Sequence, residues 1–103
     1  MAARPSIVRP PGFVVDIHGA FVRRIGLSDA DLERANLSYA DATNAIFRGA
    51  NFKDAVLKGT ILRGADLRAA KNLTREQLAG AIIDETTLLP DYLVDGPVSK
   101  RVG

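Results

Sequence analysis

Apolar residues recur at every fifth position of this chain from Val15 to Ala69. Each five-residue unit begins with a small residue, continues with a polar or variable one, and has Leu or another apolar residue third, as in Ala30-Asp31-Leu32-Glu33-Arg34. The third residues are Ile17, Val22, Leu27, Leu32, Leu37, Ala42, Phe47, Phe52, Leu57, Leu62 and Leu67. Eleven units without an insertion predict one small structural element repeated along the chain.

A period of five fits neither a helix nor a strand. The face of a helix recurs at about 3.6 residues and that of a strand at about 2 residues. Every unit must therefore end in a turn that points the next apolar side chain inward again, as in a solenoid. Gly occupies the fifth position in several units, where a turn needs unusual backbone angles. Asp or Asn occupies the second, where a short side chain bonds nearby backbone groups.

The units Ala30-Asp31-Leu32, Ala35-Asn36-Leu37, Ala50-Asn51-Phe52 and Ala65-Asp66-Leu67 resemble the motif Ala-(Asp/Asn)-(Leu/Phe)-x-x of the pentapeptide-repeat proteins. The resemblance covers residues 15–69 and, more weakly, the segment to Leu93. It implies an all-β solenoid, a right-handed quadrilateral β-helix with four units per coil. Residues twenty apart would then stack, in the columns Ile17–Leu37–Leu57, Val22–Ala42–Leu62, Leu27–Phe47–Leu67 and Leu32–Phe52. Ala42 is undersized, and we expect Phe47 and Phe52 to fill the space beside it.

The ends of the repeat region have a different composition. We expect an N-terminal arm or cap at 1–14, the β-helix at 15–69, a C-terminal cap at 70–95 and a flexible tail at 96–103. Thr74 and Gln77 form a capping-box pattern that predicts a short capping helix over 75–79, ending near Gly80 and anchored by Leu73 and Leu78. Residues 81–85 and 86–90 read as two degenerate units, with Leu88 third in the second of them.

Composition sets limits on the class of protein. Cys is absent, which excludes disulfides and thiol chemistry, and the net charge of +2 is too small to diagnose a nucleic-acid binder. No apolar stretch is long enough to cross a membrane, and the N-terminus lacks a secretion-signal pattern. We expect a cytoplasmic protein, and the ending of the chain resembles that of many bacterial pentapeptide-repeat proteins.

The residue types needed for catalysis are sparse. His18 is the one histidine, at an outward fourth position, and no nucleophile or partner carboxylate is established for it. Zinc would need further His or Cys ligands, and Asp29, Asp31 and Glu33 read as solvated turn carboxylates rather than a magnesium site. The glycines lack the lysine and hydroxyl of a phosphate loop. We therefore expect no catalytic, metal or cofactor site, and no enzymatic activity.

A run of positive charge occupies the fourth position of five consecutive units. We call it the basic belt, and it consists of Arg48, Lys53, Lys58, Arg63 and Arg68. In a four-sided coil the belt surrounds the molecule, and only Arg48 and Arg68 share a side. It is either a solubilising surface with side-chain stems packed over the coil or a binding surface for an acidic protein or a phosphate-bearing partner.

Apolar residues replace Asp or Asn at several outward second positions. The candidate apolar interface comprises Phe21, Ile46, Val56 and Ile61, together with Tyr39. Phe21 and Ile61 should share one side with Asp41 between them, whereas Ile46 and Val56 should lie on the two adjoining sides. Scattered apolar residues on a surface are ordinary, but a combined patch would suit an oligomer interface.

These features favour a non-catalytic structural or interaction module that binds a protein partner or itself. One alternative comes from the resemblance, because some pentapeptide-repeat proteins mimic DNA and modulate DNA gyrase. A mimic needs an acidic face, whereas this repeat is cationic in its C-terminal half, and it is short. The other alternative is a binder of acidic or phosphate-bearing partners through the basic belt. Direct nucleic-acid binding is not expected, because the aromatics near the belt, Phe47 and Phe52, should be buried.

Overall fold

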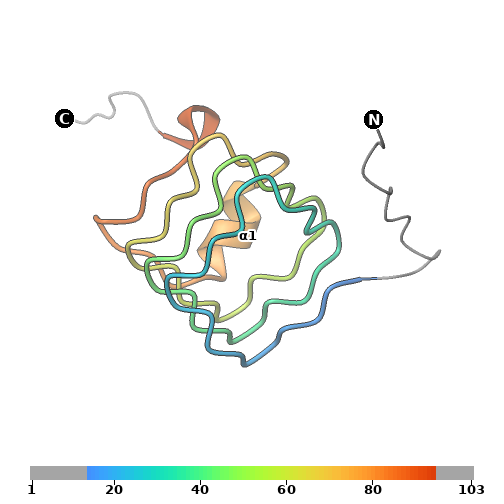
Figure 1. Ribbon diagram of the computed structural model, residues 1–103. Helices are drawn as coiled ribbons and strands as arrows, with labels where there is room; N and C mark the ends of the chain where they lie inside the picture. Colours follow the sequence, from blue (N-terminus) through green and yellow to red (C-terminus); the bar gives the residue numbers. More distant parts are fainter. Residues whose placement is uncertain (1–13, 95–103) are drawn as a thin grey trace, which may run out of the picture.

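The computed structural model describes residues 14–94, and the expected flexible tail and all of the expected N-terminal arm except Val14 lie outside the described residues. The chain winds into a stack of four-sided coils (Figure 1). Parallel bridges join residues twenty apart, such as Asp16 with Asn36 and Asn36 with Val56. The first coil spans 15–34, the second 35–54 and the third 55–74. Side A holds residues 15–19, 35–39 and 55–59, and side B holds 20–24, 40–44 and 60–64. Side C holds 25–29, 45–49 and 65–69, and side D holds 30–34, 50–54 and 70–74.

Each corner of the coil is a tight turn that the sequence specifies. The N–H of the first residue donates to the C=O of the third residue before it, as from Ala20 to Ile17 at 3.1 Å. The fifth residue has a positive φ, 69° at Gly19 and 61° at Arg24, as the third position of a type II turn requires. At the second position Asp41 accepts from the Thr43 N–H at 3.1 Å. The predicted roles of the fifth and second positions are therefore confirmed.

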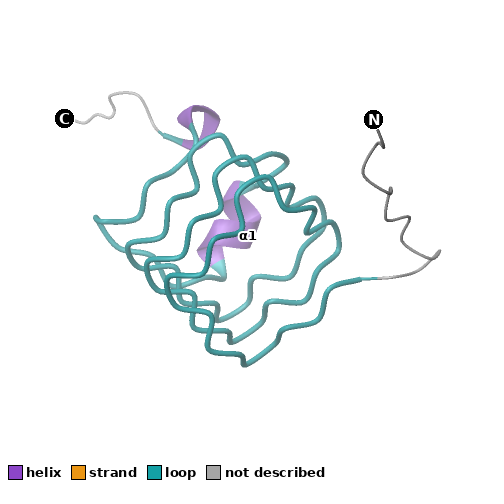
Figure 2. Ribbon diagram, in the orientation of Figure 1, coloured by secondary structure: helices purple, strands orange, loops and turns teal. Residues whose placement is uncertain are grey.

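Backbone hydrogen bonds between coils follow one pattern. Ile17 N donates to Asn36 O at 2.9 Å, Gly19 N donates to Ser38 O at 2.8 Å, and Asn36 N donates to Val15 O at 2.8 Å. The bridges are isolated pairs, so Figure 2 draws no strand arrows in the described chain. Its two helices lie near the C-terminal end of the described chain. The second-position N–H of each later coil thus points toward the coil before it.

The core consists of the first and third residues of the units. In the second coil the first and the third residues of every unit are buried. The third residues, Leu37, Ala42, Phe47 and Phe52, each have 0% exposure. The rings of Phe47 and Phe52 meet edge to face with their centroids 5.4 Å apart, and Ala42 lies in the same cluster. The predicted columns are confirmed by the bridges between residues twenty apart.

Helix α1 (Arg75–Ala79) closes the C-terminal end, as predicted. The capping box is complete: Thr74 Oγ1 accepts from Gln77 N at 3.1 Å, and Gln77 Oε1 accepts from Thr74 N at 2.8 Å. The helix is capped by Gly80, and Leu73 and Leu78 are buried. A 3-10 helix, η1 (Asp91–Leu93), follows on the same end and buries Leu93.

The register of the second degenerate unit differs from the prediction by one residue. Ile82 pairs with Ile61 and Leu88 pairs with Asp66, so both are second residues although six positions separate them. Thr87 is therefore the first residue, and its buried hydroxyl donates to Leu62 O at 2.9 Å. An extra residue within the unit that begins at Ala81 shifts Leu88 from the expected inward place to one where 43% of it is exposed.

Four carbonyls at the C-terminal end of the third coil belong to first-position residues, and each receives a donor. Thr60 O accepts from Ile82 N and Ala65 O accepts from Leu88 N. Where no strand follows, side chains take over: Gln77 Nε2 donates to Ala55 O at 2.9 Å, and Tyr92 Oη donates to Ala70 O at 2.6 Å. The C-terminal end is thus finished by two strand-like segments and two side chains.

Candidate functional site

All five residues of the basic belt are exposed, and the two that share side C are both paired with one carboxylate. Arg68 binds Asp66 in a bidentate manner, with both N–O distances 2.9 Å, and Arg48 Nη1 lies 3.7 Å from Asp66 Oδ2. The hydrogen bond from Arg68 is the main cause that lowers the pKa of Asp66. The positive charge on side C is therefore partly neutralised.

Lys53, Lys58 and Arg63 lie on sides D, A and B. The structure thus distributes the basic belt around the coil, in the arrangement expected for four units per turn. Arg63 contributes a smaller lowering of the pKa of Asp41, after the larger effect of the Thr43 hydroxyl. The belt does not form a continuous cationic groove on any single side.

The candidate apolar interface is also divided among sides. Phe21 is 85% exposed, and the bridges place it on side B with Asp41 between it and Ile61, as predicted. Ile46 and Val56 are exposed on sides C and A, and Tyr39 stands at the corner between sides A and B. The five residues therefore form no single patch.

Ile82 and Leu88 belong to the exposed apolar residues near the C-terminal end that were not among the sequence candidates. Ile82 continues the side B column above Ile61 and is 38% exposed. Leu88 continues the side C column above Asp66. Ile82 already held the second position in the predicted unit, so the sequence contained its signal, whereas the one-residue shift hid that of Leu88.

His18 makes a local contact on the surface. Its Nδ1 lies 2.6 Å from Asp16 Oδ1, both side chains are more than half exposed, and hydrogen bonding to His18 lowers the pKa of Asp16. Within residues 14–94 no three His, Asp or Glu side chains gather as a group able to hold a metal ion. No helix of the described chain has the length and apolar character needed to cross a membrane.

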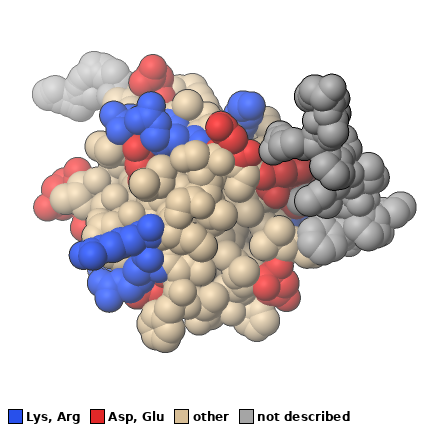
Figure 3. All heavy atoms as spheres, viewed as in Figure 1, with Lys and Arg blue, Asp and Glu red and all other residues tan. Residues whose placement is uncertain are grey.

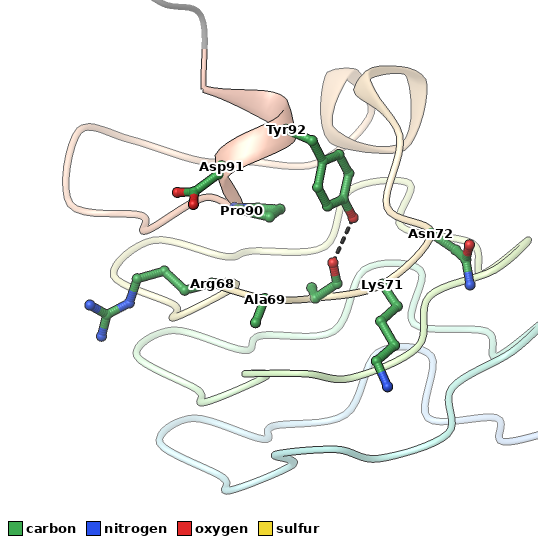
Figure 4. A pocket seen from close by; sticks show the side chains of 8 residues that line it. Arg68, Ala69, Lys71, Asn72, Pro90, Asp91 and Tyr92 are labelled. Atoms are coloured by element: carbon green, nitrogen blue, oxygen red, sulfur yellow. Dashed lines mark hydrogen bonds between the residues drawn. The ribbon is translucent and has the colours of Figure 1, made fainter.

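A hollow of about 750 Å³ lies between the third coil and η1 (Figure 4). Tyr92 lines this hollow, and its hydroxyl donates to Ala70 O and accepts from Leu73 N. Two other lining groups, Arg68 and Asn72, are bonded to Asp66 and Asn51 respectively. Three of the polar side chains that line the hollow therefore make hydrogen bonds within the protein.

Comparison with known proteins agrees with the repeat geometry. A family model described as pentapeptide repeats matches with eight copies over residues 27–64 and 50–71. The solved structure of a pentapeptide repeat protein (Rfr23) from the cyanobacterium Cyanothece 51142 is 28% identical with a TM-score of 0.65, over 75% of this chain and 52% of that chain. This chain therefore spans about half the length of that protein. Among curated proteins, none matches the chain significantly.

Two further solved structures carry the same description. One is a pentapeptide repeat protein from the Arabidopsis thaliana thylakoid lumen, with 27% identity over 73% of this chain and 58% of that chain and a TM-score of 0.43. The other is from Nostoc Pcc 7120, with 30% identity over 76% of each chain and a TM-score of 0.31.

The predicted fold class, a right-handed quadrilateral β-helix with a short C-terminal capping helix, is confirmed. The repeat model, the likeness to the Cyanothece structure and the five-residue geometry agree on one kind of structural repeat protein. The chain belongs to the pentapeptide-repeat family.

Proposed function

We propose that this protein is a non-catalytic interaction module that binds a protein partner through side B of the coil, with the exposed ring of Phe21 as the central contact. The observation that carries the proposal is the 85% exposure of Phe21 at a position where the repeat normally places Asp or Asn. Aromatic residues are enriched in protein interfaces and at their energetic centres.

The local chemistry of the unit makes this substitution informative. Where Asp or Asn stands second, its Oδ1 accepts the N–H of the fourth residue, as Asn36 does from Ser38 at 3.1 Å. Phe21 offers no such acceptor to Arg23 and exposes its ring to water. The fold therefore gains nothing from Phe21 that Asn would not supply better, which supports a role outside the fold.

The surroundings of Phe21 suit an interface with a polar rim. Asp41 lies next to it on side B, and Arg23 Nε is 3.6 Å from Asp41 Oδ2. A ring flanked by a carboxylate and a guanidinium resembles the anatomy of protein interfaces, in which an apolar centre is surrounded by polar groups.

The basic belt supports the phosphate-binding alternative less well. Arg48 and Arg68 are already paired with Asp66, and the remaining three charges lie on three sides. The gyrase alternative calls for a continuous acidic face, which the exposed belt interrupts on every side. Of these alternatives, binding of a protein partner is therefore favoured.

The test compares Phe21→Asn with Val56→Asn, an equivalent substitution at the second position on side A. Phe21→Asn should leave the melting temperature unchanged or higher, because Asn can accept the Arg23 N–H. Affinity capture from cell extract, repeated at raised salt, should retain a protein on the wild type and on Val56→Asn but lose it on Phe21→Asn. Identical capture by all three proteins, or loss of capture at raised salt alone, would contradict the proposal.

A further inference from the structure

Side B continues past the third coil into the segment that begins at Ala81, so the chain crosses this side four times. We call each crossing a rung. Bridges join the second-position residues of the four rungs into one column, in the order Phe21, Asp41, Ile61 and Ile82. The column is apolar except at Asp41, and the residues at its two ends, Phe21 and Ile82, are both exposed.

The charges of side B are divided between its two ends. Arg23 and Arg24 lie in the first rung, whereas Asp84 and Glu85 follow Ile82 in the fourth. The side chains of Arg24 and Glu85 are exposed and make no hydrogen bond or ion pair with another residue of the described range 14–94. One end of the side is therefore basic and the other acidic, and each end has one charge without a partner in this range.

Charged groups belong to the sides of the coil. In Figure 3, which looks toward the first coil, groups of both signs lie around the outline, and few lie over the middle of the face that is not drawn in grey. A molecule that approaches one side therefore meets charges as well as apolar residues, and the order of the charges on that side can orient it.

The middle of side B is already balanced within one chain. Asp41 accepts from Thr43 N and Oγ1, and its Oδ2 lies 3.6 Å from Arg23 Nε. The hydrogen bond from the Thr43 hydroxyl is the main cause that lowers the pKa of Asp41, and the charges of Arg23 and Arg63 lower it further. An interface on this side therefore needs no new partner for Asp41, and its orientation depends on the two ends.

We propose that two copies of this chain pack side B against side B as an antiparallel two-fold dimer. The axis runs across the side, between the second and third rungs, so the first rung of each copy lies on the fourth rung of the other. Phe21 then packs on Ile82 of the second copy, and Arg24 lies opposite Glu85, each contact twice in one dimer. This inference rests on the proposed function, because it uses the same side, and it identifies the partner as a second copy.

The opposite charges at the two ends select both the orientation and the occupant. If the axis ran along the coil instead, Arg24 would meet Arg24 of the second copy and Glu85 would meet Glu85, and like charges across an interface cost affinity. A partner of uniform charge would match one end of the side only, whereas a second copy that is turned over matches both. In the middle, the rung of Ile61 and Arg63 lies on that of Asp41, which brings a cation beside this carboxylate.

The size of the contact sets the expected strength of the dimer. Only one of the four sides takes part, and neighbouring rungs are about 4.8 Å apart, so the four rungs span about 14 Å. Such a contact belongs to the small class of interfaces, below about 1,200 Å² of buried surface. We therefore expect a weak, reversible dimer that forms as the protein concentration rises.

Charge reversal tests the orientation. Arg24→Glu and Glu85→Arg each place like charges together twice, so each alone should raise the dimer dissociation constant by about tenfold or more in sedimentation equilibrium. The double variant Arg24→Glu/Glu85→Arg exchanges the two charges within one chain and should restore wild-type dimerisation. Lys53→Glu, on side D, changes the net charge as much as Arg24→Glu does and should dimerise as the wild type does. Thermal melts establish that each variant is folded.

A spectroscopic measurement reads the contact itself. In a mixture of isotope-labelled and unlabelled protein, an isotope-filtered Overhauser effect between the Phe21 ring and the Ile82 methyl groups arises only between copies. We expect this signal to grow with protein concentration and to be lost in Arg24→Glu. Its absence at concentrations where sedimentation shows a dimer would place the interface elsewhere and overturn the proposal.

The remaining outcomes separate the dimer from partner binding in general. A wild type that stays monomeric at every concentration, a dimer that is indifferent to the single reversals, or a double variant that does not recover would overturn the dimer. Capture that is lost in Phe21→Asn while the protein stays monomeric would leave partner binding through side B intact and refute only the second copy as occupant. Capture and self-association that are both unchanged in Phe21→Asn would refute both proposals.

Discussion

The ring of Tyr39 occupies the space above Gly59 where a Cβ on that glycine would stand, and its Cε1 atom is 2.5 Å from that position. Tyr39 and Gly59 are twenty residues apart and share the corner between sides A and B. Gly59 also has a φ of 69° and donates its N–H to Gly80 O at 2.6 Å. The glycine is thus required twice, by the turn and by the aromatic ring that covers it.

Gly19 provides the comparison for this corner. It has the same φ of 69° but no atom within 4 Å of its Cβ position. Gly19→Ala should cost about 1 kcal/mol of unfolding free energy from the backbone alone, and Gly59→Ala should cost about 1–3 kcal/mol more from overpacking. Denaturant melts of both variants and of Tyr39→Ala/Gly59→Ala would measure this. Equal costs for the two glycines, or no relief in the double variant, would show that the ring imposes no constraint.

Truncation of two neighbouring residues in one unit should change the free energy of unfolding by very different amounts. Phe52 is fully buried and contacts Phe47, so Phe52→Ala should lose about 3–5 kcal/mol of stability. Lys53 is exposed in the belt, and Lys53→Ala should change stability by less than about 0.5 kcal/mol. Urea titration decides the comparison, and the reverse order would contradict the inward assignment of the third position.

Gln77 can be tested by a change of nearly the same shape. Its Nε2 donates to Phe52 O at 2.8 Å and to Ala55 O at 2.9 Å, and Oε1 accepts from Thr74 N. Gln77→Glu keeps the acceptor but removes the donor and sets a negative charge against two carbonyls. We expect a loss of about 1–3 kcal/mol near neutral pH, with partial recovery in acid as the carboxyl is protonated. Glu76→Gln, a neighbouring change on the same helix, should have little effect. Equal stability of Gln77→Glu and wild type would mean that the side chain does not complete the coil.

Acid should weaken the fold through the carboxyls of Asp41, Asp66 and Asp84. Hydrogen bonds from Thr43, Arg68 and Thr86, respectively, lower their pKa values from the ordinary 3.8. The folded state therefore binds fewer protons than the unfolded state, so the contribution to stability is present above pH 3.8 and is lost as pH falls through the lowered values.

Thermal melts in a pH series would measure that loss. Asp66→Asn should flatten the acid limb relative to the wild type. An unchanged acid limb in Asp66→Asn would contradict the assigned role of the Arg68–Asp66 pair.

The repeat body could be predicted because each level of the sequence agrees with the next. The small first residue, the Asp or Asn at the second and the apolar third recur in one phase, so Leu37 and Phe52 could be placed inside from pattern alone. The slip at Thr87 could not be foreseen. Thr86 and Thr87 are equally suited to the small first position, and only pairing between coils decides which of them bonds to Leu62 O.

The candidate surfaces were predictable as positions but not as environments. The four-unit coil assigned Phe21 and Ile61 to one side and the belt to all sides. The pairing of Arg48 and Arg68 with Asp66 depends on side-chain reach across coils, which spacing does not determine.

The twenty-residue spacing of the bridges also governs how this molecule can change in length. Removal of residues 35–54 would join the first coil to the third and shorten the stack of coils. Phe21 and α1 would keep their relative orientation. Removal of a single unit would instead turn everything after it by a quarter of a revolution. Insertions or deletions of four units, or of a multiple of four, therefore change the height of the stack of coils. They do not rotate the residues that follow.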